Sequence, residues 1–165
     1  MLPFYKLNSD PEVMEFLPKL LSRQESDAFA QEMHRRIEKN GWGLWALAEQ
    51  TSGKFIGFVG LNRPKVDLPC SPCMEIGWRL AKEYWGKGYA TEAGRKSLHY
   101  AFATLVMDEV VSFTALINQR SEAVMRRLGM VNSENNFAHP SVAANSQLSE
   151  HVLYKISREQ WQVSS

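Results

Sequence analysis

A glycine-rich run in the middle of the chain constrains this protein more than any other stretch. It reads Trp85-Gly86-Lys87-Gly88-Tyr89-Ala90-Thr91-Glu92-Ala93. Two glycines this close together let the backbone turn tightly and approach a ligand, because no Cβ atom intervenes. Apolar periodicity predicts a helix over 91–105, after a strand over 74–80. A glycine-rich turn that enters a helix presents several N–H groups to one anion, which predicts a phosphate-binding turn.

The turn does not fit the two commonest phosphate motifs. A dinucleotide fingerprint needs Gly or Ala where this chain has Thr91, and a P-loop needs Ser or Thr directly after Lys87. What remains resembles the pyrophosphate loop of the GNAT acyltransferase superfamily, Arg/Gln-x-x-Gly-x-Gly/Ala. Gly88 and Ala90 occupy its fourth and sixth places. Trp85 departs from the general pattern, but it resembles the branch of ribosomal-protein N-terminal acetyltransferases.

A second stretch carries the same resemblance. Residues 118–130 match that branch's pattern Asn-x-x-Ser-x-x-Val-x-x-x-Leu-Gly-Phe/Met. The residues also predict local structure: Ser121 is a suitable N-cap for a helix over 121–128, and Gly129 is suited to end it. The resemblance extends to 42–61 and 151–157, so it spans nearly the whole chain.

The resemblance implies an α/β fold with a mixed, mostly antiparallel sheet flanked by helices, in one domain over residues 1–165. Further helices are expected from Asp10, from the capping box at Ser22 to Asn40, and over 157–161. Strands are expected over 43–48, 55–62, 109–116 and 151–157, with a long loop over 132–149. The family's usual first strand is not recognisable. Its absence would leave strand 43–48 at the sheet edge, where a homodimer could form.

Charge and composition bear on the partners. The 165 residues carry 19 Lys and Arg against 18 Asp and Glu, a net charge of +1. This balance predicts no nucleic-acid partner and no attraction to an anionic membrane. No signal peptide is recognisable, and no apolar run reaches the length of a membrane span. A cytoplasmic protein is expected.

The resemblance makes acetyl-CoA the expected acetyl donor and a primary amine the acceptor, either a protein N-terminus or a small amine, with no metal. The residues implied for cofactor binding are Trp78, Arg79, Leu80, Trp85, Gly86, Lys87, Gly88, Tyr89, Ala90, Thr91, Asn118 and Ser121. The candidate catalytic residues are Glu75, Ser121 and Asn118.

Acetyl transfer needs a neutral amine, a stabilised oxyanion and a leaving thiolate. Because an alkylamine has a pKa near ~10, a base is required. Glu75 is the candidate, since its apolar neighbours could raise the pKa of its carboxyl; alternatively it pairs with a cation or orients substrate. A backbone N–H near Trp78 or Arg79 is the expected oxyanion donor. Gly77 indicates either a bulge in this strand or close packing.

The group that protonates the thiolate is less evident. Where many family members have a Tyr, this chain has Met125. Ser121 and Asn118 are the polar residues expected near the sulfur, although capping a helix and ending a strand would also explain them. Tyr154 is a second candidate acid, and departure without an acid is an alternative, because a thiol pKa near ~8.5 is low.

Other residues support further readings. His139 and His151 are candidate bases, and Trp42 and Trp45 are expected near the acceptor, although most aromatic residues serve the core. The segment Cys70-Ser71-Pro72-Cys73 permits a zinc or redox site, but there are no further cysteines and it precedes a strand rather than a helix. Direct transfer in a ternary complex is favoured. The alternatives are a CoA-binding sensor without catalysis and a redox or metal protein.

Overall fold

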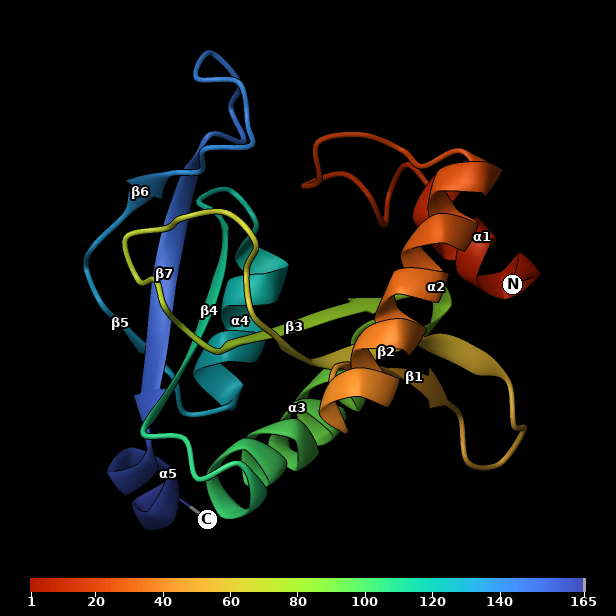
Figure 1. Cartoon of the computed structure of the whole chain (residues 1–165). Coiled ribbons are helices and arrows are strands. Elements are labelled where there is room, and N and C mark those ends of the chain that lie inside the picture. The colour runs from red at the N-terminus through yellow and green to blue at the C-terminus, as the bar shows by residue number, and fades with distance from the viewer. Residues whose placement is uncertain (165) are drawn as a thin grey trace.

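The computed structural model describes residues 1–164 (Figure 1). Its helices are α1 (Leu2–Ser9), α2 (Arg23–Asn40), η1 (Lys82–Tyr84), α3 (Tyr89–His99), η2 (Tyr100–Thr104), α4 (Gln119–Arg127) and α5 (Arg158–Ser164). Its strands are β1 (Leu44–Ala48), β2 (Phe55–Asn62), β3 (Glu75–Leu80), β4 (Glu109–Ala115), β5 (Val131–Asn132), β6 (Phe137–Ala138) and β7 (Glu150–Ser157).

The strands form one seven-stranded sheet in the order β1-β2-β3-β4-β7-β5, with β6 also paired to β7. Every pairing is antiparallel except that of β3 with β4, which is parallel. This arrangement confirms the expected fold class. In the described part of the chain β1 pairs only with β2, so it is an edge strand, as expected if the first strand of the family is missing. Its pairing with a second copy stays a prediction.

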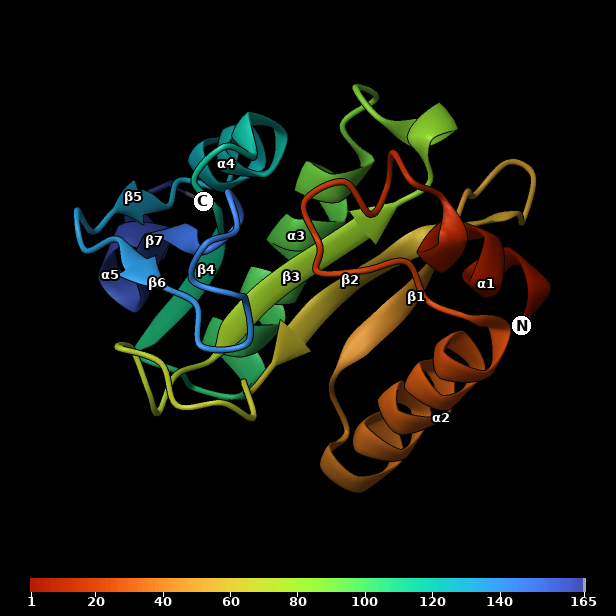
Figure 2. The same cartoon turned by 90° about the horizontal axis from the view of Figure 1, so that it is seen from above.

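Helices cover both faces of the sheet. Figure 2 shows α1 and α2 on one side of β1–β3 and α3 on the other. On the first side, which we call the α2 face, the core is built from Phe4, Leu7, Met33 and Phe58. On the second, the α3 face, residues of α3, α4 and four strands share one cluster that includes Leu61, Ile76, Leu98, Val110, Met125 and Ile156.

Strands β3 and β4 separate soon after they meet. Their only register partners are Glu75 and Val111, next to a bond from the N–H of Val111 to the carbonyl oxygen of Met74 (2.8 Å). The Ser112 hydroxyl then donates to the carbonyl oxygen of Ile76 (3.0 Å). Beyond this point the sheet is open between the two strands. Because N–H and C=O groups alternate sides along a strand, those of Trp78 point into the gap.

The bulge considered at Gly77 is absent from the pairing of β3 with β2. Their register is continuous from Gly57 opposite Leu80 to Asn62 opposite Glu75. The register shift in this part of the sheet lies in β1, between Leu47 and Ala48. The gap therefore comes from the divergence of two parallel strands and not from an extra residue in β3.

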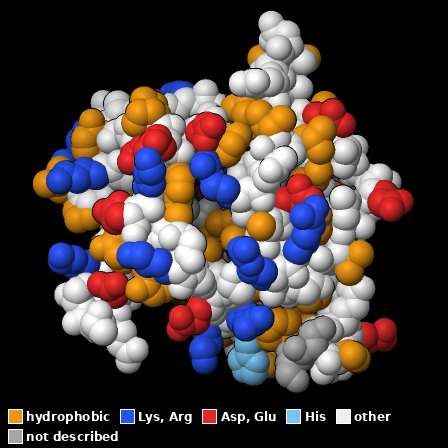
Figure 3. Space-filling view, turned by 180° about the vertical axis from the view of Figure 1, so that it is seen from behind, with side chains coloured by type: hydrophobic (Ala, Val, Ile, Leu, Met, Phe, Trp, Pro, Cys, Tyr) orange, Lys and Arg blue, Asp and Glu red, His pale blue; other side chains and the backbone are white. Residues whose placement is uncertain are grey.

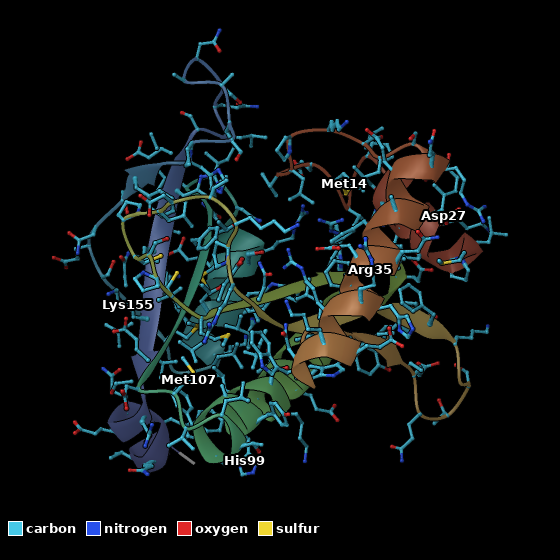
Figure 4. All side chains as sticks on the ribbon, viewed as in Figure 1. Met14, Asp27, Arg35, His99, Met107 and Lys155 are labelled. Atoms are coloured by element: carbon cyan, nitrogen blue, oxygen red, sulfur yellow. The ribbon has the colours of Figure 1, made fainter. Side chains whose placement is uncertain are left out.

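The expectation of a helix from Asp10 is wrong. Helix α1 begins at Leu2 and ends at Ser9, and Asp10 is extended, with ψ 118°. Pro11 accounts for the end of α1, since a residue before proline is disfavoured in the helical region. The Asp10 carboxylate instead accepts the N–H of Glu12 (2.9 Å) and closes a turn. The segment from Asp10 to Ser22 continues in turns and is anchored by buried Met14 (Figure 4).

The other expected elements are confirmed with small changes at their ends. The helix expected over 91–105 begins at Tyr89, and its last turn, η2, is a π-helix. Helix α4 is capped by Asn118, not by Ser121 as expected, because the Asn118 side chain accepts the N–H of Ser121 (3.2 Å). The expected loop over 132–149 contains two short strands: β5 overlaps its first residue, and β6 lies within it.

The surface mixes charges of both signs. On the side seen in Figure 3, Lys and Arg side chains are interspersed with Asp and Glu. Among the residues that the structure describes, no helix combines the length and apolar character that a membrane span requires.

The capping box of α2 gives a first test. The Ser22 side chain accepts the N–H of Glu25 (3.2 Å), and the Glu25 carboxylate accepts the N–H of Ser22 (2.8 Å). Ser22→Ala should lower the free energy of unfolding by about 1 kcal/mol and the Tm by roughly 2–4 °C. Thermal unfolding with Ser9→Ala as control measures this, since the Ser9 hydroxyl makes only a 3.4 Å bond. Equal Tm values for the two variants would contradict the assignment.

Candidate active site

A cavity of about 910 Å³ passes through the gap between β3 and β4. Alternation along β3 places Glu75, Gly77 and Arg79 on the α2 face and Trp78 and Leu80 on the α3 face, and all five line the cavity. The glycine-rich turn and α4 border it on one side. The segment between α1 and α2, helix α2 and the loop before β7 border it on the other. Residues from both faces of the sheet thus line one cavity.

The glycine-rich turn has the geometry of an anion site. Gly86 and Gly88 adopt φ angles of 71° and 86°, in the left-handed region that favours glycine. Gly88 is the N-cap of α3, and a Cβ added at either glycine would meet no atom within 4 Å. The space beside both glycines is therefore open, at the end of α3 where the first N–H groups have no partner within the helix. This cradle fits a pyrophosphate group.

Two hydrogen bonds fix this turn on the sheet. The indole N–H of Trp85 donates to the carbonyl oxygen of Leu80 (2.8 Å), which ties the turn to the end of β3. The Tyr89 hydroxyl donates to the Glu49 carboxylate (2.9 Å), just beyond β1. The turn is therefore held at both of its ends in the conformation that opens its N–H groups.

Arg120 joins the two sides of the cavity. Its guanidinium lies 4.4 Å from the ring centre of Trp85 and 5.3 Å from that of Phe16, and it pairs with Glu15 at 2.5 Å. These contacts link α4 to the segment between α1 and α2. Sequence reasoning missed Arg120, because its partner Glu15 is 105 positions away.

Asn118 and Ser121 form a small polar cluster on the cavity wall. The Asn118 amide donates to the hydroxyl oxygens of Thr114 (2.9 Å) and Ser121 (3.1 Å). The Ser121 oxygen is thus an acceptor in this bond, which leaves its own proton available to a further partner. Asn118 caps α4 and also orients Ser121 toward the cavity.

Glu75 is a carboxylate with an altered acidity. Burial raises the pKa of its carboxyl to about 7, against the effect of one hydrogen bond from Asn62 (2.9 Å). Asn62 is in turn oriented by Arg36 of α2, which donates to its amide oxygen at 2.5 Å. Neither Asn62 nor Arg36 was found from the sequence. Only the position of Asn62 at the end of a predicted strand could have suggested it.

His139 and His151 also line the cavity, with ring centres 4.8 Å apart. Burial lowers the pKa of both imidazoles, which favours their neutral form. Nδ1 of His151 lies 3.2 Å from the carbonyl oxygen of Ser149, and Nδ1 of His139 accepts the N–H of Ser141 (3.2 Å). The two residues are 12 positions apart in the sequence, and β6 and β7 bring them together.

Tyr154 and the early tryptophans lie outside the cavity lining. The Tyr154 hydroxyl donates to Glu122 of α4 (2.7 Å), and its side chain is buried in the core. Trp45 packs edge-on against Tyr100 on the α3 face, and Trp42 packs against the same cluster. Both tryptophans thus serve the core, which was the alternative to a place near the acceptor, and the register of β1 turns Trp45 toward α3.

The cysteines form a local pair away from the cavity. Cys70 and Cys73 are free thiols with their sulfur atoms 2.9 Å apart, next to Val111 and Phe113. Burial and the bond to Cys70 raise the pKa of the Cys73 thiol to about 12. A thiol of such high pKa is a poor nucleophile at neutral pH.

Most of the residues predicted for cofactor binding line the cavity together. These are Trp78, Arg79, Leu80, Trp85, Gly86, Gly88, Tyr89, Ala90, Thr91, Asn118 and Ser121. Lys87 does not line it, and its ammonium group lies over the Tyr84 ring. Arg79 lines it on the α2 face, opposite to the glycine-rich turn.

Comparison with known proteins identifies the family. Residues 2–131 match the family described as "Acetyltransferase (GNAT) domain". The chain belongs to this family. GNAT acetyltransferases use acetyl-CoA, so the protein is an acetyl-CoA-dependent acetyltransferase. It is 33% identical over 164 residues to the FsC-acetyl coenzyme A-N(2)-transacetylase of Aspergillus fumigatus, covering 94% of this chain and 68% of that protein.

Two solved acetyltransferase structures have the same fold as this chain. Their names indicate different acceptors. One is the ribosomal-protein-S5-alanine acetyltransferase of Vibrio fischeri, with a TM-score of 0.73, 19% identity and coverage of 95% and 86% of the two chains. The other is the spermidine N-acetyltransferase of Vibrio cholerae in complex with CoA and spermine, with a TM-score of 0.73, 18% identity and coverage of 96% and 89%. At these identities the likeness shows the fold alone.

Gly88 provides the test of the cofactor turn. An alanine there has to adopt φ near 86° and directs its methyl group into the open cradle. Gly88→Ala should weaken acetyl-CoA binding about tenfold or more, measured as Kd by calorimetry. Gly53→Ala is the matched control, because Gly53 also has a positive φ (66°) with open space but lies in the β1–β2 turn. Equal loss of affinity in both variants would argue against the assignment.

Proposed function

We propose that the enzyme transfers acetyl from acetyl-CoA to a primary amine by direct attack across the β3–β4 gap. The donor binds on the α3 face, along the glycine-rich turn, and the acceptor enters on the α2 face. The observation that carries this proposal is the position of Glu75. A carboxyl with a pKa of about 7 opens into the same cavity as the phosphate cradle, from the opposite face of the sheet.

Glu75 acts as the base in this proposal. An alkylammonium has a pKa near ~10, so the acceptor must lose a proton before it can attack. A carboxylate with a pKa of about 7 holds that proton better than an ordinary Glu, yet is half ionised at neutral pH. The bond from Asn62 keeps one carboxylate oxygen in place and leaves the other for the amine.

The backbone of β3 and the start of α4 serve the other two requirements. Acetyl-CoA supplies the acetyl group as a thioester. The N–H of Trp78 points into the gap and can donate to the carbonyl oxygen as negative charge develops there. Ser121, with its proton free, is placed to donate to the departing sulfur. Neither cysteine lines the cavity, which disfavours an acyl-enzyme.

The first test is the pH dependence of the wild-type enzyme and of Glu75→Gln. Because the base must be ionised, kcat/KM should rise with pH through an apparent pKa near 7. Glu75→Gln should lose about 10²–10⁴-fold in kcat and lose this limb of the profile. Release of CoA thiol with a panel of amines measures both.

Asn62→Ala sharpens the same test. It removes the hydrogen bond that lowers the pKa of Glu75, so the rising limb should move to higher pH. Glu150→Gln, an exposed change in β7, should leave the profile unaltered. A Glu75→Gln enzyme with the wild-type pH limb would refute the role of Glu75. A wild type that binds acetyl-CoA but acetylates no amine would favour the sensor alternative.

Ser121 and Tyr154 are separated by a second pair of variants. Ser121→Ala should lower kcat about tenfold, since one hydrogen bond to a charged atom is lost. Tyr154→Phe should leave kcat near the wild-type value and lower only the Tm, because its hydroxyl bonds to Glu122 outside the cavity lining. Steady-state kinetics and thermal unfolding of both variants provide the comparison. A larger loss of kcat in Tyr154→Phe would reverse the assignment.

A further inference from the structure

We infer that Arg79 forms an anion subsite for the acceptor, so that the favoured acceptor is an amine carrying a carboxylate or similar anionic group several bonds away. The inference rests on the proposed function, because it takes the α2 face as the acceptor side. It replaces the cofactor role that the resemblance implied for Arg79.

The first argument is the position of Arg79. It follows Glu75 by four residues on one strand, so both side chains lie on the α2 face, whereas the glycine-rich turn borders the α3 face. The guanidinium lies 5.2 Å from the ring centre of Phe58 and 5.9 Å from that of Phe29. Both rings line the cavity as well. Arg79 therefore faces the acceptor side and not the cofactor phosphates.

The second argument is that this cation lacks a negative partner. Within the part of the chain that the structure describes, Arg79 forms no ion pair, and its one hydrogen bond runs to the amide oxygen of Asn8 (2.5 Å). A guanidinium has five N–H donors, so most remain available. Burial lowers the pKa of Arg79 to about 10, which still leaves it charged at neutral pH. A half-buried, charged guanidinium without an ion-pair partner is suited to a carboxylate.

The third argument is the open floor between the two charges. Gly77 lies between Glu75 and Arg79 on the same face, and a Cβ added there would meet only the Glu75 carboxylate, at 3.7 Å. The Cα atoms of Glu75 and Arg79 are separated by four residues of strand, about 13 Å. Because the two side chains start from Cα atoms this far apart, an acceptor with several bonds between amine and carboxylate is favoured over a free α-amino acid. An extended amino acid or a short peptide fits.

The charges around the cavity agree with this choice. Among the described residues that line it, Glu75 is the only carboxylate, against the three arginines Arg79, Arg120 and Arg127. An acceptor with several ammonium groups would therefore find one carboxylate and meet an unpaired cation. A polyamine is disfavoured for this reason, and an amine with an acidic end is favoured.

A purely structural role is the competing explanation. Asn8 is fully buried, donates to the Ser26 hydroxyl (3.0 Å), and could use Arg79 only to hold α1 on the sheet. The two explanations differ in what they predict for substrates. A structural role affects every acceptor alike, whereas an anion subsite affects only acceptors that carry the anion.

The test compares ω-aminooctanoate with ω-aminooctanamide and the matching terminal diamine. The wild type should prefer the carboxylate by roughly tenfold or more in kcat/KM. Arg79→Met should abolish this preference. Asn8→Asp should do the same with little change of shape, because it supplies the guanidinium with a permanent carboxylate. Arg35→Met, which removes an exposed cation from α2, should keep the preference.

Binding of octanoate decides the inference independently of turnover. With CoA present, octanoate should bind the wild type at least tenfold more tightly than octanamide does, and this difference should vanish in Arg79→Met and Asn8→Asp. Equal binding of acid and amide to the wild type, or an unchanged preference in both variants, would overturn the inference. If octanoate binds at Arg79 but the enzyme acetylates none of the amines in separate assays without octanoate, the proposed function is overturned and the subsite stands.

Discussion

The parallel contact between β3 and β4 determines what the rest of this molecule can do. The two strands share one register pair and one side-chain bond from Ser112 before they separate. A continuous sheet would satisfy the amide of Trp78 with a neighbouring strand and would close the passage between the two faces. Because the strands diverge, main-chain donors face a cavity while β2 continues to hold β3 in register on its other side. The edge of β3 that pairs with β2 therefore holds the strand in place, and the edge that faces β4 is open to the cavity.

The same strand also arranges the charges of the site. Residues two apart on β3 share a face, so Glu75 and Arg79 lie on the α2 face with Gly77 between them. Burial acts on both but in opposite directions, since it raises the pKa of the carboxyl to about 7 and lowers that of the guanidinium to about 10. On the proposed function, one environment thus suits the carboxyl to act as a base and leaves the guanidinium charged.

Local signals in the sequence predicted much of the fold, and long-range contacts account for what they missed. The capping box at Ser22 and Glu25 and the turn at Gly88 depend on neighbours within a few residues, and both are confirmed. After Asp10 the cap pattern yields only a turn, and the segment is held by a distant contact, the bond from the N–H of Leu21 to the carbonyl oxygen of Asn8 (2.9 Å). Tertiary contacts of this kind leave no periodic trace in a single sequence.

In the site, too, local signals identified residues, whereas their orientation depends on distant contacts. Glu75 could be proposed from its apolar neighbours, but the orientation of its carboxylate depends on Asn62 and Arg36, which are 13 and 39 positions away. Arg79 could be located on the strand, yet its role depends on Asn8 of α1, 71 positions away.

A cavity that is lined from both faces of a sheet has a kinetic consequence. On the proposed function, donor and acceptor approach the reacting atoms from opposite sides, so neither substrate occupies the route by which the other enters or leaves. The order in which they bind is then not imposed by the shape of the cavity. The contacts of Arg120 with Glu15 and Trp85 connect the two borders of the cavity. Any order of addition would have to arise from such a connection between the two sides rather than from one substrate blocking the other.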